Sequence, residues 1–190
     1  MSADDRRLIA ECLEGRPAAF EELVRRYQDR LYNTVYRLLD NSEDAQDVVQ
    51  EAFLSAYQAL DRFKGDAQFF TWLYRIAVNT AISFKRKRRV ALRLGRHGAE
   101  PDSPAEPLDS SESNRPGHLL EQAERERSIR SALNRLSPEH RAVLILKDME
   151  DMKYETIAGI MQIPIGTVRS RLHRARMELR SLLQREKDAF

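Results

Sequence analysis

Basic and polar side chains gather on one face of a predicted helix near the C-terminus, where they could bind nucleic acid. Between Ile163 and Arg180 the chain has five arginines and one acidic residue, Glu178. An α-helix turns by about 100° per residue. This spacing puts the apolar side chains of the stretch on one side of the helix: Val168, Leu172, Ala175 and Leu179. Polar side chains that point away from this side suit base edges, and they are Thr167, Ser170, His173 and Arg174. The flanking arginines suit phosphates, and they are Arg169, Arg171 and Arg176.

The longer segment from Tyr154 to Arg180 has the pattern of a helix-turn-helix, with a short helix, a tight turn and a longer basic helix. An ordinary amphipathic helix with a solvated basic face has the same periodicity and is the alternative. The excess of arginine favours DNA binding.

A second candidate surface is acidic. Asp47, Gln50 and Glu51 lie together on the side of a predicted helix opposite its apolar stripe, which includes Val48, Val49, Ala52 and Tyr57. A plain solvated face is the alternative. In a protein that also binds DNA, an acidic face would repel phosphate, so it suits a protein partner better.

The segment from Phe63 to Arg89 combines aromatic and basic residues and ends in the basic run Lys85 to Arg89. Aromatic rings stack on unpaired bases while cations bind the backbone, so the segment suits single-stranded or melted nucleic acid. The alternative is that Phe70, Trp72 and Tyr74 belong to the core and the basic run is a solvated helix end. We expect both in part, with Trp72 largely in the core and the basic run on phosphate.

Catalytic chemistry has little support. The four histidines are scattered, without cysteines or carboxylates at metal-ligand spacing. The chain also lacks a phosphate-binding glycine loop and a nucleophile elbow. We therefore expect no catalytic residues, no metal, no cofactor and no small-molecule substrate.

Charge is unevenly distributed along the 190 residues, although the net charge is only +2. Met1 to Leu60 has twelve acidic and seven basic residues, whereas Lys85 to Arg96 has seven basic residues and no acidic one. Such a distribution indicates two kinds of partner, one of them polyanionic. The single cysteine, Cys12, excludes an internal disulfide. Neither a signal peptide nor a membrane-spanning run is evident, so we expect a cytoplasmic protein.

Apolar residues along the chain recur at the three-four spacing of helices, so helices should position these residues, and no strand is predicted. Asn41 and Ser42 should end one helix and cap the next, and Ser137 followed by Pro138 should start another. Between the helical parts, His97 to Gly117 has four prolines, five acidic residues and little to bury. The fold class is therefore all-α, with two small helical domains, residues 1–96 and 118–190, joined by a flexible linker, residues 97–117.

Three motifs in order resemble a bacterial sigma factor of the extracytoplasmic-function group. Asp47 to Phe53 resembles the polymerase-binding motif of its promoter-melting domain (region 2). Phe63 to Asp66 followed by Phe70 to Asn79 resembles the part that opens and reads the minus-ten element. Tyr154 to Arg176 resembles the helix-turn-helix domain (region 4) that reads the minus-thirty-five element.

The resemblance implies a subunit that binds core RNA polymerase, directs promoter-specific initiation and is controlled by an anti-sigma factor. The residues implied to bind polymerase are Asp47, Gln50 and Glu51. Those implied to bind the minus-ten element are Lys64, Gly65, Asp66, Ala67, Trp72, Arg75 and Asn79, with the first four capturing a flipped base. Those implied to bind the minus-thirty-five duplex are Thr167, Arg169, Ser170, Arg171, His173, Arg174 and Arg176. His173 departs from many relatives, so the upstream base preference is not implied.

The length of the linker predicts how the domains relate. Its 21 residues reach at most about 70 Å when extended, close to the roughly 70 Å of two duplex turns. As a random coil the linker averages only about 25 Å. We therefore expect polymerase to hold the domains apart and the free protein to fold them together, masking the DNA-binding faces.

Two other functions remain open from sequence. A stand-alone helix-turn-helix regulator that binds duplex operator DNA explains Tyr154 to Arg180 but leaves the acidic and aromatic motifs without a role. An RNA-binding or nucleic-acid-processing enzyme would use the aromatic residues but lacks a catalytic cluster.

Overall fold

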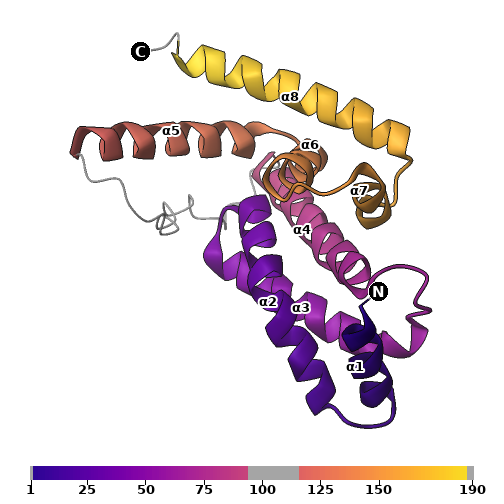
Figure 1. Ribbon diagram of the computed structural model, residues 1–190. Helices are drawn as coiled ribbons and strands as arrows, with labels where there is room; N and C mark the ends of the chain where they lie inside the picture. Colours follow the sequence, from indigo (N-terminus) through magenta and orange to yellow (C-terminus); the bar gives the residue numbers. More distant parts are fainter. Residues whose placement is uncertain (1, 94–115, 188–190) are drawn as a thin grey trace.

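The computed structural model describes residues 2–93 and 116–187, and the regular elements within these two ranges are all helical (Figure 1). The all-α prediction is confirmed for this part of the chain. The expected linker, residues 97–117, lies outside the described residues except for its last two, which begin a helix.

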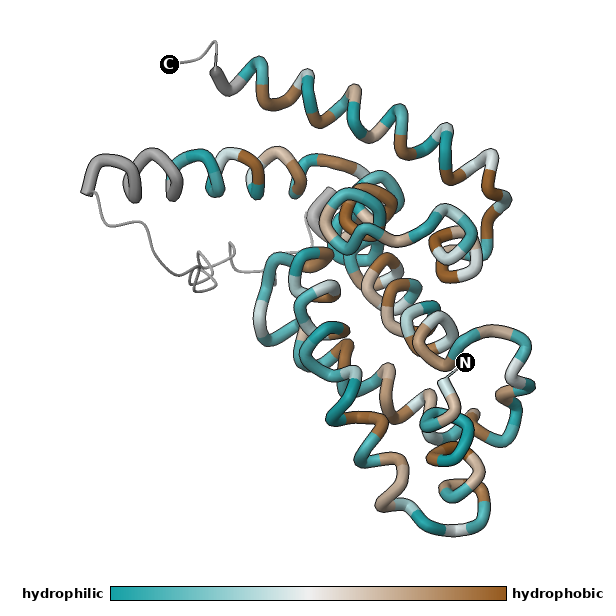
Figure 2. Tube along the Cα trace, viewed as in Figure 1, coloured by the Kyte–Doolittle hydropathy of each residue, from teal (hydrophilic) through white to brown (hydrophobic). Residues whose placement is uncertain are grey.

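The N-terminal unit has helices α1 (Ala3–Leu13), α2 (Ala18–Leu39), α3 (Ser42–Gln58) and α4 (Phe69–Arg93), with a 3-10 turn at Leu60–Arg62. Asn41 caps α3 as predicted, because its side chain accepts a hydrogen bond from the Asp44 amide at 2.9 Å. Helices α2, α3 and α4 pack against one another, and α1 packs on α2. Figure 2 shows apolar residues recurring along these helices with hydrophilic ones between them, which is the amphipathic pattern of a bundle.

The C-terminal unit has helices α5 (Pro116–Arg135), α6 (Pro138–Leu144), α7 (Tyr154–Met161) and α8 (Ile165–Lys187). The Ser137 side chain caps α6 by accepting from the His140 amide at 3.2 Å. A π-helical turn, Ile145–Met149, follows α6 directly. It leads into the segment that carries α7 and then α8.

The two units pack against each other, as the short reach of the linker predicts. Helix α4 contacts both α6 and α7, and it crosses beneath them in Figure 1. Buried residues from both units form one hydrophobic cluster. The buried Arg141 guanidinium joins them further, since its Nε donates to the Arg37 carbonyl of α2 at 2.8 Å. The described chain is therefore in a closed arrangement.

Candidate nucleic-acid interface

Helices α7 and α8 form the predicted helix-turn-helix. Gln162 ends α7 in the left-handed conformation, at φ 54°, and reverses the chain before α8. Helix α8 then begins, with the Thr167 amide donating to the Pro164 carbonyl at 2.9 Å. Val168, Leu172 and Ala175 are buried and Leu179 is half-buried. The predicted core side of α8 is confirmed.

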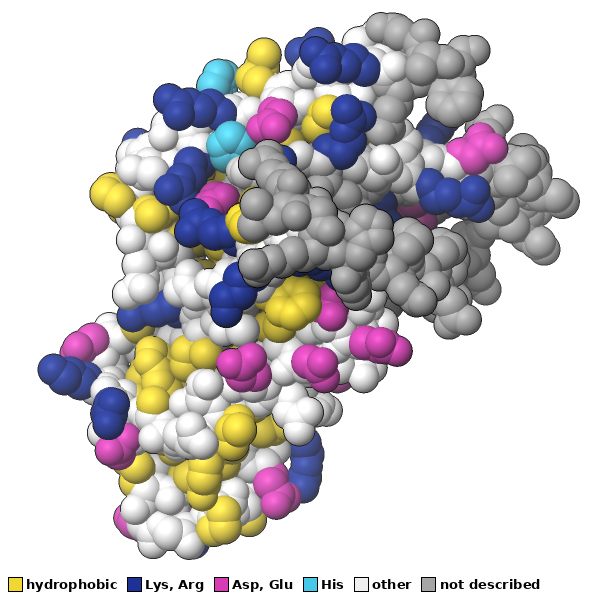
Figure 3. Space-filling model, turned by 180° about the vertical axis from the view of Figure 1, so that it is seen from behind, with side chains coloured by type: hydrophobic (Ala, Val, Ile, Leu, Met, Phe, Trp, Pro, Cys, Tyr) yellow, Lys and Arg dark blue, Asp and Glu magenta, His cyan; other side chains and the backbone are white. Residues whose placement is uncertain are grey.

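The opposite side of α8 is open to solvent. Ser170, His173 and Arg174 are exposed there, and Arg169 is exposed beside them with its guanidinium 5.7 Å from the centre of the Tyr154 ring. Thr167 and Arg171 are half-buried. Figure 3 shows Lys and Arg side chains gathered around the histidine side chains on the upper part of that view. This surface can receive a polyanion without rearrangement.

Arg176 differs from the other predicted contacts because a carboxylate already holds it. Its Nε donates to Asp148 at 3.0 Å and its terminal nitrogen to the other carboxylate oxygen, in a bidentate pair with the π-helical turn. A phosphate bound by Arg176 would have to displace Asp148. Its assignment to DNA stays a prediction.

The loop before α4 presents its polar atoms to solvent. Lys64, Gly65 and Asp66 are exposed, and Ala67 is half-buried. Gly65 has φ 76°, a conformation that strains any residue with a side chain. Aromatic packing anchors the loop, since the Phe63 ring lies 5.0 Å from Trp72, which is itself half-buried. The sequence expectation for Trp72, a largely core position, is met in part.

Helix α4 places Arg75 and Asn79 on one face, both half-buried. The C-terminal unit covers this face at Arg75, whose Nε donates to the Gly159 carbonyl of α7 at 3.0 Å. A Cβ on Gly159 would lie only 3.5 Å from the Thr71 methyl group, so α7 sits directly on α4. The predicted masking is thus found at Arg75 of α4 but not at Lys64, Gly65 and Asp66, and it is wrong for α8, whose outer side is exposed.

The side chain of Tyr74 packs α4 into the hydrophobic core. It is fully buried, its ring lies 4.1 Å from that of Phe70, and burial raises the pKa of its phenol to about 12. An unfolded chain ionises tyrosine near pH 10. The contribution of Tyr74 to stability is therefore complete below pH 10 and is lost as the pH rises toward 12. Tyrosinate absorbance and helical circular dichroism, followed together in an alkaline titration, should change in the same pH interval.

The acidic surface of α3 has the predicted geometry. Asp47, Gln50 and Glu51 are exposed, while Val48, Val49 and Ala52 are buried beneath them. Leu54 continues the same exposed row with 55% of its surface accessible, and its place in this row was not predicted from the sequence. Helical spacing from Asp47 through Glu51 to Leu54 was the available signal. These four residues, called the α3 face below, combine carboxylates with an apolar side chain.

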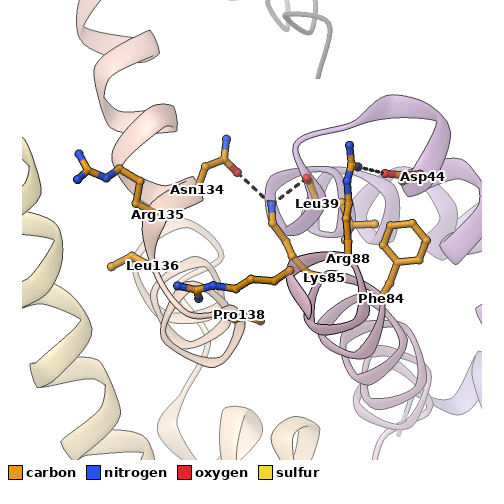
Figure 4. A pocket seen from close by; sticks show the side chains of 10 residues that line it. Leu39, Asp44, Phe84, Lys85, Arg88, Asn134, Arg135, Leu136 and Pro138 are labelled. Carbon is orange, nitrogen blue, oxygen red and sulfur yellow. Dashed lines mark hydrogen bonds and ion pairs between the residues drawn. The ribbon is translucent and has the colours of Figure 1, made fainter. Parts of the chain in front are cut away.

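Much of the basic run at the end of α4 binds protein groups. Lys85 donates to the Leu39 carbonyl at 2.9 Å and to the Asn134 side chain at 3.0 Å, and Arg88 pairs with Asp44 at 2.9 Å (Figure 4). These residues line a hollow of about 480 Å³ where the two units meet. Arg86 also pairs with Glu139 of α6, at 2.8 Å. In the longer basic stretch Lys85 to Arg96, the residues from Leu94 onward lie outside the described residues.

Among the described residues no group of histidine, cysteine and carboxylate side chains could hold a metal ion. No described helix is long and apolar enough to cross a membrane.

Comparison with known proteins gives consistent matches along the chain. Residues 23–91 match the family model described as Sigma-70 region 2, and residues 126–179 match that described as Sigma-70, region 4. The chain is 38% identical over 187 residues to the RNA polymerase sigma-H factor of Pseudomonas aeruginosa, covering 95% of this chain and 94% of the relative. It is 37% identical over the same length and coverage to the ECF RNA polymerase sigma-E factor of Escherichia coli K12.

Two solved structures have a similar arrangement. One is the sigma factor RpoE in complex with the anti-sigma factor NepR from Bartonella quintana, with a TM-score of 0.67 and 25% identity, covering 87% of this chain and 96% of that one. The other is CnrH in complex with the cytosolic domain of CnrY, with a TM-score of 0.65 and 28% identity, covering 95% and 97%.

Proposed function

The chain belongs to the extracytoplasmic-function group of RNA polymerase sigma factors, and from this premise we propose which of its surfaces performs each step of initiation. It binds core RNA polymerase and directs promoter-specific transcription initiation by melting and recognising the minus-ten element and reading the minus-thirty-five element. The assignment rests on three distinct surfaces that one chain presents. They are the acidic α3 face, the aromatic loop and face of α4, and the open basic side of α8.

Each surface has a proposed partner. The α3 face, including Asp47, Gln50 and Glu51, binds polymerase. The minus-ten strand binds the loop and α4 through Lys64, Gly65, Asp66, Ala67, Trp72, Arg75 and Asn79. The minus-thirty-five duplex binds α8 through Thr167, Arg169, Ser170, Arg171, His173, Arg174 and Arg176. The matched segments, residues 23–91 and 126–179, fall inside the proposed domains 1–96 and 118–190.

The closed arrangement is consistent with a separate partner for each surface. Because α7 covers Arg75 of α4, both promoter elements can be bound only after the units separate. Core polymerase supplies a scaffold that can hold them apart. The two similar solved structures are complexes with NepR, an anti-sigma factor, and with the cytosolic domain of CnrY, so we propose that an anti-sigma partner also controls this chain. We infer a non-catalytic factor that needs no cofactor and works in the cytoplasm, with polymerase.

Asp47→Ala is expected to weaken binding to core polymerase by about 10-fold, because it removes an exposed carboxylate from the docking surface. A titration of fluorescently labelled protein with core polymerase measures the affinity. Asp61→Ala removes the same charge from the neighbouring 3-10 turn and should leave the affinity unchanged. Equal affinities of the Asp47 variant and the wild type would remove the α3 face from the polymerase interface.

The same titration addresses the regulator alternative. A stand-alone helix-turn-helix regulator would bind duplex operator DNA tightly without polymerase and would not bind polymerase at the α3 face.

A further inference from the structure

A carboxylate of the C-terminal unit is held by two arginines of the N-terminal unit. Glu150 follows the π-helical turn, and its side chain is only 7% exposed. It accepts a hydrogen bond from Arg37 at 2.6 Å and approaches the Arg30 Nε at 3.5 Å, and both arginines come from α2. The Glu150 amide also donates to the Ile145 carbonyl at 3.0 Å, which is the bond that closes the π-helical turn. The turn therefore fixes the backbone from which the Glu150 side chain reaches the two arginines.

One of the two arginines, Arg30, lies beside an aromatic surface. The Arg30 guanidinium is 4.8 Å from the centre of the half-buried Phe70 ring, and Arg75 comes from the same helix as Phe70. Cations next to an accessible aromatic ring form the combination that binds single-stranded nucleic acid, because the ring stacks on a base and the cations bind the backbone. Neither Arg30 nor Arg37 belongs to the motifs that assign DNA contacts to this chain.

A hollow of about 530 Å³ lies between the units, next to Arg30 and Glu150. Arg30, Phe70 and Arg75 line it from the N-terminal unit, and Glu150 and Glu155 line it from the C-terminal unit. A carboxylate has the charge and the hydrogen-bond acceptors of a phosphate oxygen pair, and guanidinium groups bind both in the same bidentate or forked manner. The guanidinium groups that hold the Glu150 carboxylate could therefore hold a phosphate in its place.

We propose that Arg30 and Arg37 bind the phosphates of the melted promoter strand, and that Glu150 is a built-in phosphate mimic that occupies this site in the free protein. The proposal rests on the promoter-melting function of the N-terminal unit, and it adds two strand-binding residues on α2 and a competitor on the π-helical turn. Single-stranded DNA and Glu150 exclude each other. Binding of the strand therefore favours separation of the units, and separation of the units favours binding of the strand.

The first test measures the affinity of the full-length free protein for a labelled single DNA strand of about 12 nucleotides. The strand has a mixed sequence, and the salt concentration is fixed. Glu150→Gln keeps the shape of the side chain and removes its charge, and it should tighten binding by about 10-fold. Glu155→Gln is the matched control, because it removes the same charge from the same hollow, and Glu155 is exposed. It should change the affinity by less than about 2-fold. Adding Arg37→Gln to the Glu150 variant should abolish the gain.

A second measurement uses the wild-type protein alone and does not depend on how any variant folds. Small-angle scattering should give a compact particle in the free state, and saturating single-stranded DNA should increase its radius of gyration. Equal strand affinities of the wild type and the Glu150 variant, or equal gains from the Glu150 and Glu155 variants, would overturn the proposal. An unchanged radius at saturation would overturn it as well. All of these readouts are independent of transcription, so a failure here is distinguishable from a failure of the proposed function.

Discussion

Leu172→Ala is expected to lower the free energy of unfolding by about 2–5 kcal/mol, the range for a buried leucine truncated in a packed core. Leu172 is only 2% exposed and lies on the side of α8 that packs against the C-terminal core. The substitution leaves a cavity where α8 meets that core. Thermal and urea unfolding followed by circular dichroism measure the loss.

Met177→Ala is the matched control on the same helix. Met177 is 55% exposed, so its truncation should change stability by no more than about 0.5 kcal/mol. Similar losses from the two variants would mean that α8 is not oriented as described, and its proposed DNA face would be lost with that orientation.

Arg174→Ala is expected to cost about 1–3 kcal/mol in binding of the holoenzyme to the upstream promoter duplex and to relax base preference at one position. Arg174 is exposed at the centre of the open side of α8, where a guanidinium can reach a base edge in the major groove. The measurement is a competition series in which each upstream base pair is changed in turn. The loss should concentrate at one base pair.

Arg180→Ala serves as the comparison for this series. Arg180 is exposed on the same helix but lies outside the base-facing set, so any loss should be small and uniform across sequences. If Arg174→Ala also weakens every sequence equally, Arg174 is a phosphate contact and another residue sets the base preference.

The sequence predicted the elements because their signals are local. The three-four spacing of Val168, Leu172 and Ala175 oriented α8 correctly, and the side chains of Asn41 and Ser137 cap the helices that they were expected to cap. Tyr57 shows the limit of such patterns. It belongs to the apolar stripe of α3, yet it is 45% exposed, packed edge-on against Phe20 at the border of the core.

Contacts between the units could not be predicted from local patterns. Arg37 and Glu150 are more than a hundred positions apart, and nothing near either residue indicates the other. Within the C-terminal unit, the pairing of Arg176 with Asp148 also depends on a contact between distant segments, the π-helical turn and α8. The length of the linker indicated that the units would meet, but not that α7 would cover α4 while α8 stays open.

Run-off transcription with purified core polymerase shows whether this chain directs promoter-specific initiation. The template needs a minus-ten and a minus-thirty-five element at natural spacing, obtained by selecting sequences that the reconstituted holoenzyme transcribes from a random promoter library. We expect transcripts with one defined start site, which disappear when either element is scrambled and weaken with Asp47→Ala. A protein that binds duplex DNA tightly alone but yields no promoter-specific transcript with core polymerase would contradict this expectation.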